Sequence, residues 1–214
     1  MGLRAGSSKI RGLVATEVDQ RPRTSITTHT RNNGLLSYSD PTSQKIIGIF
    51  GVSEKDINYV SLKITCSTGY TIDWGDGTVE NYNSGVEALH KFNWSDISAS
   101  TEVTILGTVL RQSKVTITAQ GSGEITFFDF HERHDSVPAA SPVAWLELTI
   151  NTPHVTSMQS SIGGASIYLT KLQRVNIISV HSSCNHADNL FYGCYNLTIV
   201  EFGFDTSQIS DWRN

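Results

Sequence analysis

Hydrophobic and polar residues alternate along several short segments of the chain after about residue 45. In the clearest of these, Val60, Leu62, Ile64 and Cys66 alternate with polar or charged residues. A period of two residues is typical of a strand with one buried face. The same reading predicts further strands at residues 45–50, 70–74, 102–106, 114–118 and 124–128. With the glycine-rich turn at residues 75–78, these strands indicate a small antiparallel sandwich.

The last third of the chain repeats itself. Leu172, Val175 and Ile177 recur 25 residues later, and the same shift carries Cys184 onto Ile209 and Ala187 onto Trp212. A looser earlier copy aligns Trp145, Leu148 and Ile150 with the same three residues, and residues 155–165 with residues 184–194. A period of about 25 residues lies in the range of solenoid repeats, in which each unit buries its apolar face on its neighbour. The pattern therefore predicts about three stacked units over residues 145–214.

Residues 1–44 have no hydrophobic period and are rich in basic residues. Arg4, Lys9, Arg11, Arg21, Arg23 and Arg31 stand against only Glu17 and Asp19. Such a segment cannot bury enough surface to order itself alone. Two interpretations stay open, a disordered tail and an extended arm that lies across a neighbouring subunit by strand addition. Residues 131–144 break both periodicities and are interpreted as a linker.

Composition narrows the class of protein. Hydrophobic residues make up 38% and charged residues 17% of the chain, and the net charge is −4. This profile favours a β-rich extracellular or virion protein over a helical enzyme, and it does not indicate direct nucleic-acid binding. No segment reaches the length of a membrane span, and the first residues lack the apolar run of a secretory signal, so export by the ordinary route is not expected.

Two families resemble parts of this chain. Residues 70–78 read YTIDWGDGT and are followed by Leu89-His-Lys-Phe92, which is similar to the PKD-type immunoglobulin-like domain. Residues 190–197 read LFYGCYNL and residues 204–212 read FDTSQISDW, which resembles the BspA-type leucine-rich repeat. The resemblances imply an Ig/PKD-like antiparallel β-sandwich at residues 45–130 followed by a short leucine-rich-repeat solenoid at residues 145–214. Proteins with BspA-type repeats frequently also carry WGDGT domains, which makes the two resemblances consistent with each other.

The sequence contains only weak candidates for a metal-binding or catalytic site. Asp73 and Asp76 could share a calcium ion, but Asp76 is also the residue expected to hold the turn through its own backbone hydrogen bonds. Residues 131–135 read HERHD, which lacks the HExxH spacing and is interpreted as a polar loop. No Gly-x-Ser-x-Gly motif or phosphate-binding loop is present, and no cofactor is expected. Cys184 and Cys194 are expected to be buried thiols and not a disulfide.

These features favour a non-enzymatic phage virion structural protein, such as a head decoration, neck or tail-associated protein. The expected partners are copies of itself or other virion proteins, bound through the basic arm and through an uncapped last repeat that contains Ile209 and Trp212. Tyr192 and Tyr195 are candidates for contact with a host-surface glycan or protein. A secreted or surface-attached bacterial adhesin is the alternative, and a carbohydrate-active accessory protein is a weaker one.

Overall fold

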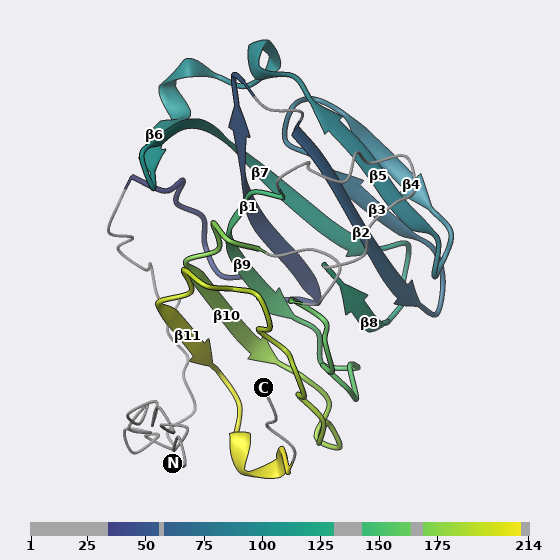
Figure 1. The fold of residues 1–214 in the computed structure, drawn as a ribbon. Helices are drawn as coiled ribbons and strands as arrows, with labels where there is room; N and C mark the ends of the chain where they lie inside the picture. Colours follow the sequence, from purple (N-terminus) through teal and green to yellow (C-terminus); the bar gives the residue numbers. More distant parts are fainter. Residues whose placement is uncertain (1–33, 56–57, 131–142, 164–168, 211–214) are drawn as a thin grey trace, which may run out of the picture.

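The computed structural model describes residues 34–55, 58–130, 143–163 and 169–210, and within these ranges the protein is mainly β (Figure 1). The predicted mainly β class is confirmed. In the part of the chain that the structure describes, helical segments are limited to three short 3-10 turns, η1 (Trp94–Asp96), η2 (Ala99–Thr101) and η3 (Thr206–Gln208). No helix in the described ranges is long and apolar enough to cross a membrane.

Two sheets pack on each other around a shared core. The smaller sheet is antiparallel and has the order β5 (Glu87–Phe92), β2 (Asn58–Cys66), β8 (Ile125–Asp129). The larger sheet is mixed, and its strands are, in spatial order, β11 (Ile199–Phe202), β10 (Arg174–Ser179), β9 (Trp145–Asn151), β1 (Lys45–Ser53), β7 (Thr108–Ala119), β3 (Tyr70–Asp73) and β4 (Val79–Tyr82). A further strand, β6 (Glu102–Ile105), also pairs with β7.

The hydrophobic residues that alternate with polar ones in the sequence form the core between the two sheets. Val60, Leu62, Ile64 and Cys66 of β2 are all buried and face the larger sheet, as their period of two residues predicts. Each of the six predicted strand segments overlaps an observed strand, but β7 begins six residues before its predicted start. The short edge strand β4 was not predicted, because its sequence VENY carries no apolar alternation.

The larger sheet continues through the predicted boundary between the sandwich and the repeats. β9 pairs antiparallel with β1 along the register from Lys45–Asn151 to Phe50–Trp145. One hydrophobic cluster extends from Ile46 in β1 to Ile209 after η3. The two predicted modules therefore share one sheet and one core. Most of the predicted linker, residues 131–142, lies outside the described residues.

The three parallel strands pair in the register that the repeat predicts. Val175 lies opposite Leu148 on one side and Val200 on the other, and Ile177 lies opposite Ile150 and Phe202. Beyond the strands, the following coils also stack, since the Met158 N–H donates to the carbonyl of His186 and the Gly163 N–H to that of Leu190. Figure 1 shows β9, β10 and β11 side by side, extending the sheet beyond β1.

The end of the predicted N-terminal arm packs on the chain's own sheet. Residues 34–44, here called the strap, cross the face of the larger sheet opposite to the sandwich core. Leu35, Leu36 and Tyr38 contact a second hydrophobic cluster that contains Ile49 and Leu146. Residues 34–44, which the sequence assigned to the arm, thus pack on the sheet of their own chain, and residues 1–33 lie outside the described part of the chain.

Polar contacts fix the course of the strap. Gln112 of β7 accepts from the Leu36 N–H at 2.8 Å and donates to the carbonyl of Gly34 at 2.8 Å. Further along, Asn151 of β9 donates to the carbonyl of Pro41 at 2.8 Å. Because these contacts satisfy backbone groups that would otherwise be covered without partners, the strap is held by more than apolar burial.

Candidate functional site

The turn between β3 and β4 uses both candidate metal ligands as turn-forming residues. Asp73 Oδ1 accepts from the Gly75 N–H at 3.0 Å, and Asp76 Oδ1 accepts from the Thr78 N–H at 2.9 Å. Such Asx contacts are the structural role expected for aspartate in a tight turn. Gly75 has a φ of 78°, and a Cβ there would lie 2.4 Å from the carbonyl oxygen of Lys114. The WGDGT turn therefore requires glycine at this position on two grounds.

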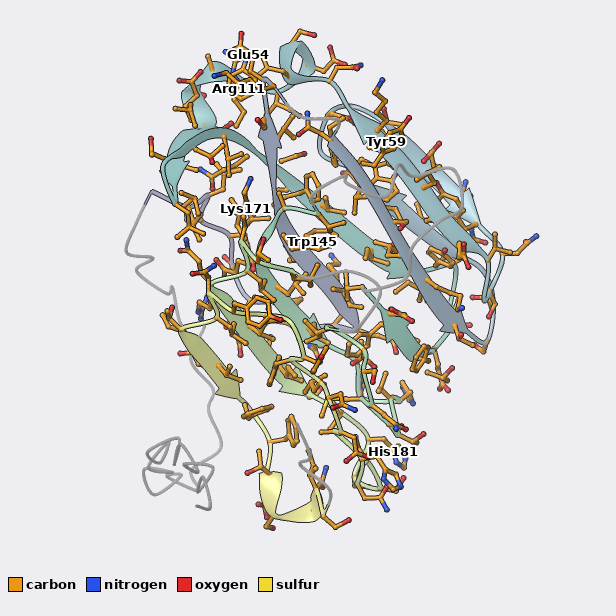
Figure 2. All side chains as sticks on the ribbon, in the orientation of Figure 1. Glu54, Tyr59, Arg111, Trp145, Lys171 and His181 are labelled. Carbon is orange, nitrogen blue, oxygen red and sulfur yellow. The ribbon has the colours of Figure 1, made fainter. Side chains whose placement is uncertain are left out.

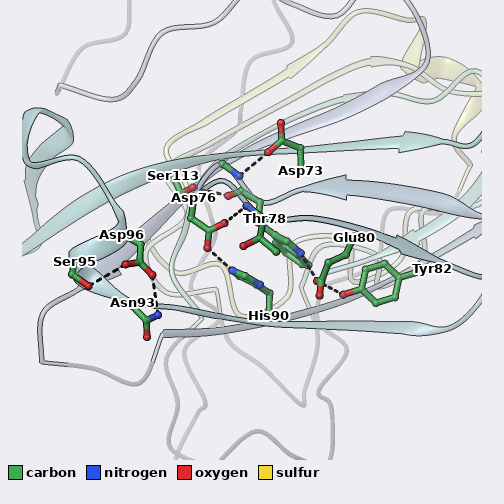
Figure 3. A network of polar contacts seen from close by, with 12 residues as sticks. Asp73, Asp76, Thr78, Glu80, Tyr82, His90, Asn93, Ser95, Asp96 and Ser113 are labelled. Carbon is green, nitrogen blue, oxygen red and sulfur yellow. Dashed lines mark hydrogen bonds and ion pairs between the residues drawn. The ribbon is translucent and has the colours of Figure 1, made fainter.

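A polar and aromatic network joins this turn to the smaller sheet (Figure 3). His90 of β5 approaches Asp76 Oδ2 with its Nε2 at 2.7 Å and stacks on Trp74 at a centroid distance of 4.7 Å. Trp74 is fully buried, and its indole N–H donates to Glu80 Oε2 at 2.7 Å. The hydroxyl of Tyr82 donates to the same oxygen at 2.6 Å. These side chains lock the β3–β4 hairpin onto β5.

The network does not have the composition of a metal site. A calcium ion needs about six oxygen ligands. Within the described ranges no group of three or more His, Cys, Asp or Glu side chains is placed to hold a metal ion. Both carboxylate oxygens of Asp76 are already in contact with Thr78 and His90. The arrangement therefore holds the hairpin in position. The second candidate cluster, residues 131–135, lies outside the described residues.

The environment of Asp76 predicts that the stability of the folded protein depends on pH. Partial burial raises the pKa of this carboxyl group, but the hydrogen bond from Thr78 and the contact with His90 outweigh burial and hold the pKa below its ordinary value. Since the pKa is lower in the folded than in the unfolded protein, the stabilisation is present above the ordinary value of about 3.9 and is lost as the pH falls through the folded value.

Asp76→Asn is therefore expected to lower the free energy of unfolding by about 1–2 kcal/mol near neutral pH, because asparagine keeps the turn acceptor and loses the charge. The difference from the wild type should shrink as the pH falls below the ordinary value of about 3.9 and through the lower pKa of the folded protein. Urea unfolding across this pH range measures it, with Asp73→Asn as the matched control on an exposed turn carboxylate. A difference that persists unchanged in acid would contradict the assignment.

The cysteines occupy the predicted buried positions. Cys66, Cys184 and Cys194 are free and buried. Burial raises the pKa of the Cys194 thiol to about 12, and it also raises that of Cys184. A thiol held protonated in this way is a poor nucleophile. The three cysteines are therefore core residues of the fold.

A line of charged residues crosses the parallel strands on the face that carries the strap. Arg174 of β10 donates from Nη1 to Glu147 Oε1 of β9 at 2.6 Å, and from Nη2 to Glu201 of β11. Both carboxylates are 27 residues from the arginine in sequence. Glu147 is fully buried, and the Tyr38 hydroxyl of the strap also donates to its Oε1 at 3.2 Å. This set, Glu147, Arg174 and Glu201, is called the charge ladder below.

The charge ladder was not predicted from the sequence, although a signal for it exists. An acidic, a basic and an acidic residue recur at one spacing, and that spacing is close to the period of the apolar repeat. A parallel pairing of successive units brings such positions to adjacent strands. Searching the repeat for alternating charges as well as for apolar residues would have found the ladder.

The predicted interaction residues fall into three groups. Tyr192 and Tyr195 are 43% and 71% exposed, on the coil that leads into β11. Ile209 is 5% exposed and packs in the main core, and its role in binding a partner through the last repeat stays a prediction. The remaining residues lie outside the described ranges, and they are Arg4, Lys9, Arg11, Arg21, Arg23 and Trp212.

The outer edge of β11 is the feature that brings exposed groups together. β11 ends the larger sheet, with β10 on one side and no described strand on the other. Ile199, at the start of the strand, is 47% exposed, and the Glu201 side chain is 43% exposed. Tyr192 and Tyr195 precede this edge by a few residues along the chain. The edge offers backbone hydrogen-bonding groups, apolar surface and a negative charge in one place.

Comparison with protein-family models, with curated proteins and with solved structures finds no match to this chain.

Proposed function

We propose that this chain is a non-enzymatic structural protein that docks on a larger assembly, most specifically a phage virion, and displays a binding surface there. The observation that carries the proposal is the outer edge of β11, with which no described strand pairs. An unpaired strand edge is a template for another strand, and soluble proteins usually blunt or cover it. Here the edge carries exposed Ile199 and a single carboxylate, Glu201.

The proposed architecture is a PKD-like sandwich followed by a short array of leucine-rich-type repeats. Support comes from the WGDGT turn with its buried Trp74 and its contact to His90, and from the parallel strands at repeat spacing. Both kinds of module bind or space other molecules. Under this proposal no cofactor is needed, and the partners are copies of the chain or other proteins of the particle.

A second candidate, a secreted or surface-attached bacterial adhesin, is favoured by the two exposed tyrosines. Tyr192 and Tyr195 present rigid aromatic area at low cost in conformational entropy, which suits recognition of a glycan or a protein. A carbohydrate-active accessory protein is a weaker alternative, and the same two tyrosines are the residues that support it.

Fractionation of the producing culture separates these candidates. A density gradient is probed with an antibody against this chain, followed by immunogold microscopy of the particle band. The virion proposal expects the chain at the density of intact particles, and expects it to leave that density when the particles are disrupted. Recovery with the cell envelope or as secreted protein in the culture medium would support the adhesin, and recovery only as free protein of the cell interior would overturn both proposals.

A further inference from the structure

The turn of the β6–β7 hairpin holds a leucine in a backbone conformation that suits other residues better. Ile105 of β6 pairs with Thr108 of β7, so only two residues form the turn. These are Leu106 and Gly107, and both have a positive φ, 49° and 76°. Two-residue turns with positive φ at both positions favour asparagine or aspartate before the glycine, because a left-handed backbone crowds the Cβ of other residues. The leucine is therefore strained.

The strained leucine is also exposed to solvent. Leu106 is 62% exposed, and Val109, which lies opposite Thr104 across the hairpin, is 51% exposed. Two other non-glycine residues in the described ranges have a positive φ, and both are polar, Ser160 and Asn189. Backbone strain concentrates at binding sites, where it holds a side chain in place for a ligand or a partner. Strain and apolar exposure at one residue thus point to a contact site.

The strands of the hairpin are fixed to the fold, so the turn is presented on a rigid support (Figure 1). Ile105 and Leu110 are buried in the second hydrophobic cluster, and Val103 packs against it. Across the strands, Arg111 donates to Glu102 Oε1 from Nε at 3.2 Å and from Nη2 at 3.1 Å. A side chain on a rigid support loses little conformational entropy when it binds.

The charges around the turn narrow the kind of partner. Residues 94–110 contain two acidic residues and no basic residue. Arg111, which follows, is held by Glu102 and by two backbone carbonyls of residues 94–97. Adsorption to an anionic membrane surface depends on basic residues beside the apolar ones. The turn lacks that attraction, so an apolar protein surface fits it better than a lipid surface.

The size of the apolar surface narrows the partner further. Stable association of two copies usually buries about 800 Å² on each of them, far more than the side chains of Leu106 and Val109 supply. A small apolar anchor contributes most when it enters a pocket that excludes water, inside a larger contact. Docking on an assembly supplies such a larger contact.

We propose that the β6–β7 turn is a docking element, in which Leu106, flanked by Val109, inserts into an apolar pocket of a different protein of the assembly. This inference rests on the proposed function, since it names the element through which the chain docks and the chemistry of the surface that receives it.

Leu106→Asn separates the strain of the turn from the contact with the partner. Asparagine relieves the strain, so the melting temperature of the purified full-length chain should rise by about 2–4 °C. The same variant should lower the number of copies per particle in the particle band by roughly tenfold or more. A residue with a purely structural role does not raise stability and lose docking together. A fall in melting temperature would mean that Leu106 supports the fold of its own chain, and would overturn the proposal.

Two control variants accompany this measurement. Leu106→Met keeps an apolar side chain in the same turn and should dock as the wild type does. Val79→Thr removes a different apolar residue, which is 60% exposed on β4, and should also dock as the wild type does. If Val79→Thr lost as much docking as Leu106→Asn, any exposed apolar residue would contribute, and the proposal would be wrong.

Photo-cross-linking identifies the occupant of the contact. A benzophenone side chain is introduced in place of Leu106 in the producing culture, and in place of Val79 as the control. The proposal expects an adduct with a different protein of the assembly from position 106 and none from position 79. An adduct with lipid, with a second copy of the chain or within the chain itself would overturn it.

The inference and the proposed function can fail separately. A Leu106→Asn chain that reaches the particle band in the wild-type amount overturns the inference and leaves the virion proposal intact. Recovery of the wild type with the cell envelope overturns the virion proposal. The variants are then scored in that fraction, where the same loss by Leu106→Asn would uphold the inference with an envelope protein as the partner. Recovery of the wild type only as free protein of the cell interior overturns both.

Discussion

Replacement of Arg174 by methionine is expected to lower the free energy of unfolding by about 3–5 kcal/mol. The reason is the position of Glu147, which is fully buried and holds its ion pair with Arg174 at 2.6 Å. Removing the arginine leaves a buried carboxylate without its countercharge, and desolvation of that group is the dominant cost. Denaturant unfolding of the purified variant measures the change.

Two matched variants separate the buried pair from the exposed one. Replacing both partners, Glu147→Leu with Arg174→Met, should recover most of the loss, because an apolar pair of similar volume carries no desolvation cost. Tyr38 keeps a partner in this variant, since its hydroxyl lies 2.7 Å from Thr149 Oγ1. Glu201→Ala removes the half-exposed carboxylate and should cost about 1 kcal/mol or less. If Arg174→Met proved as mild as Glu201→Ala, the buried charge would not be the controlling feature.

Replacement of Trp145 by alanine is the second large effect, with an expected loss of about 3–5 kcal/mol. Trp145 is fully buried and lies at the centre of the molecule, where β9 joins β1 (Figure 2). Its ring makes edge contacts to Phe50 and Phe130, both at 5.3 Å between centroids. It also covers Gly48, where a Cβ would lie 2.3 Å from the indole ring. Loss of the ring leaves a large cavity at the junction of the two predicted modules.

Trp145→Phe is the control for this effect. The indole N–H makes no hydrogen bond within the described part of the chain, so phenylalanine removes ring volume but no polar contact. We expect it to cost less than half as much as alanine, about 1–2 kcal/mol. Thermal and denaturant unfolding of both variants provide the comparison. Similar losses for alanine and phenylalanine would show that the cavity does not set the cost.

The elements that the sequence predicted are those with one buried face or a regular repeat. β2 was predicted because its buried residues alternate, and the pairing of Val175 with Leu148 and Val200 because an apolar repeat preserves register. β1 was also predicted as a strand, at residues 45–50. Its burial on both faces depends on the strap, whose residues Leu35, Leu36 and Tyr38 have no period of their own.

The candidate site was predicted in part. The Asx contact of Asp76 with Thr78 was expected, since both residues belong to one local turn. The contact of Asp76 with His90 joins two sheets, and a local pattern carries no information about which strands face each other. The charge ladder was missed for a different reason, because only the apolar residues of the repeat were aligned, although its charged residues also recur at one spacing.

The direction of β9 has a consequence for the order in which the protein folds. β9 is antiparallel to β1 and parallel to β10, so it is the strand on which the two kinds of pairing meet. Its pairing with β1 joins Lys45 to Asn151 and so closes a loop of about half the chain's length, which is slow compared with forming a hairpin. During synthesis, the edge of β1 that pairs with β9 stays unpaired until β9 has left the ribosome. The repeats that follow β9 have no strand to pair with before then. A ribosome stalled before residue 145 would thus present an aggregation-prone nascent sandwich, with β1 available to any passing strand.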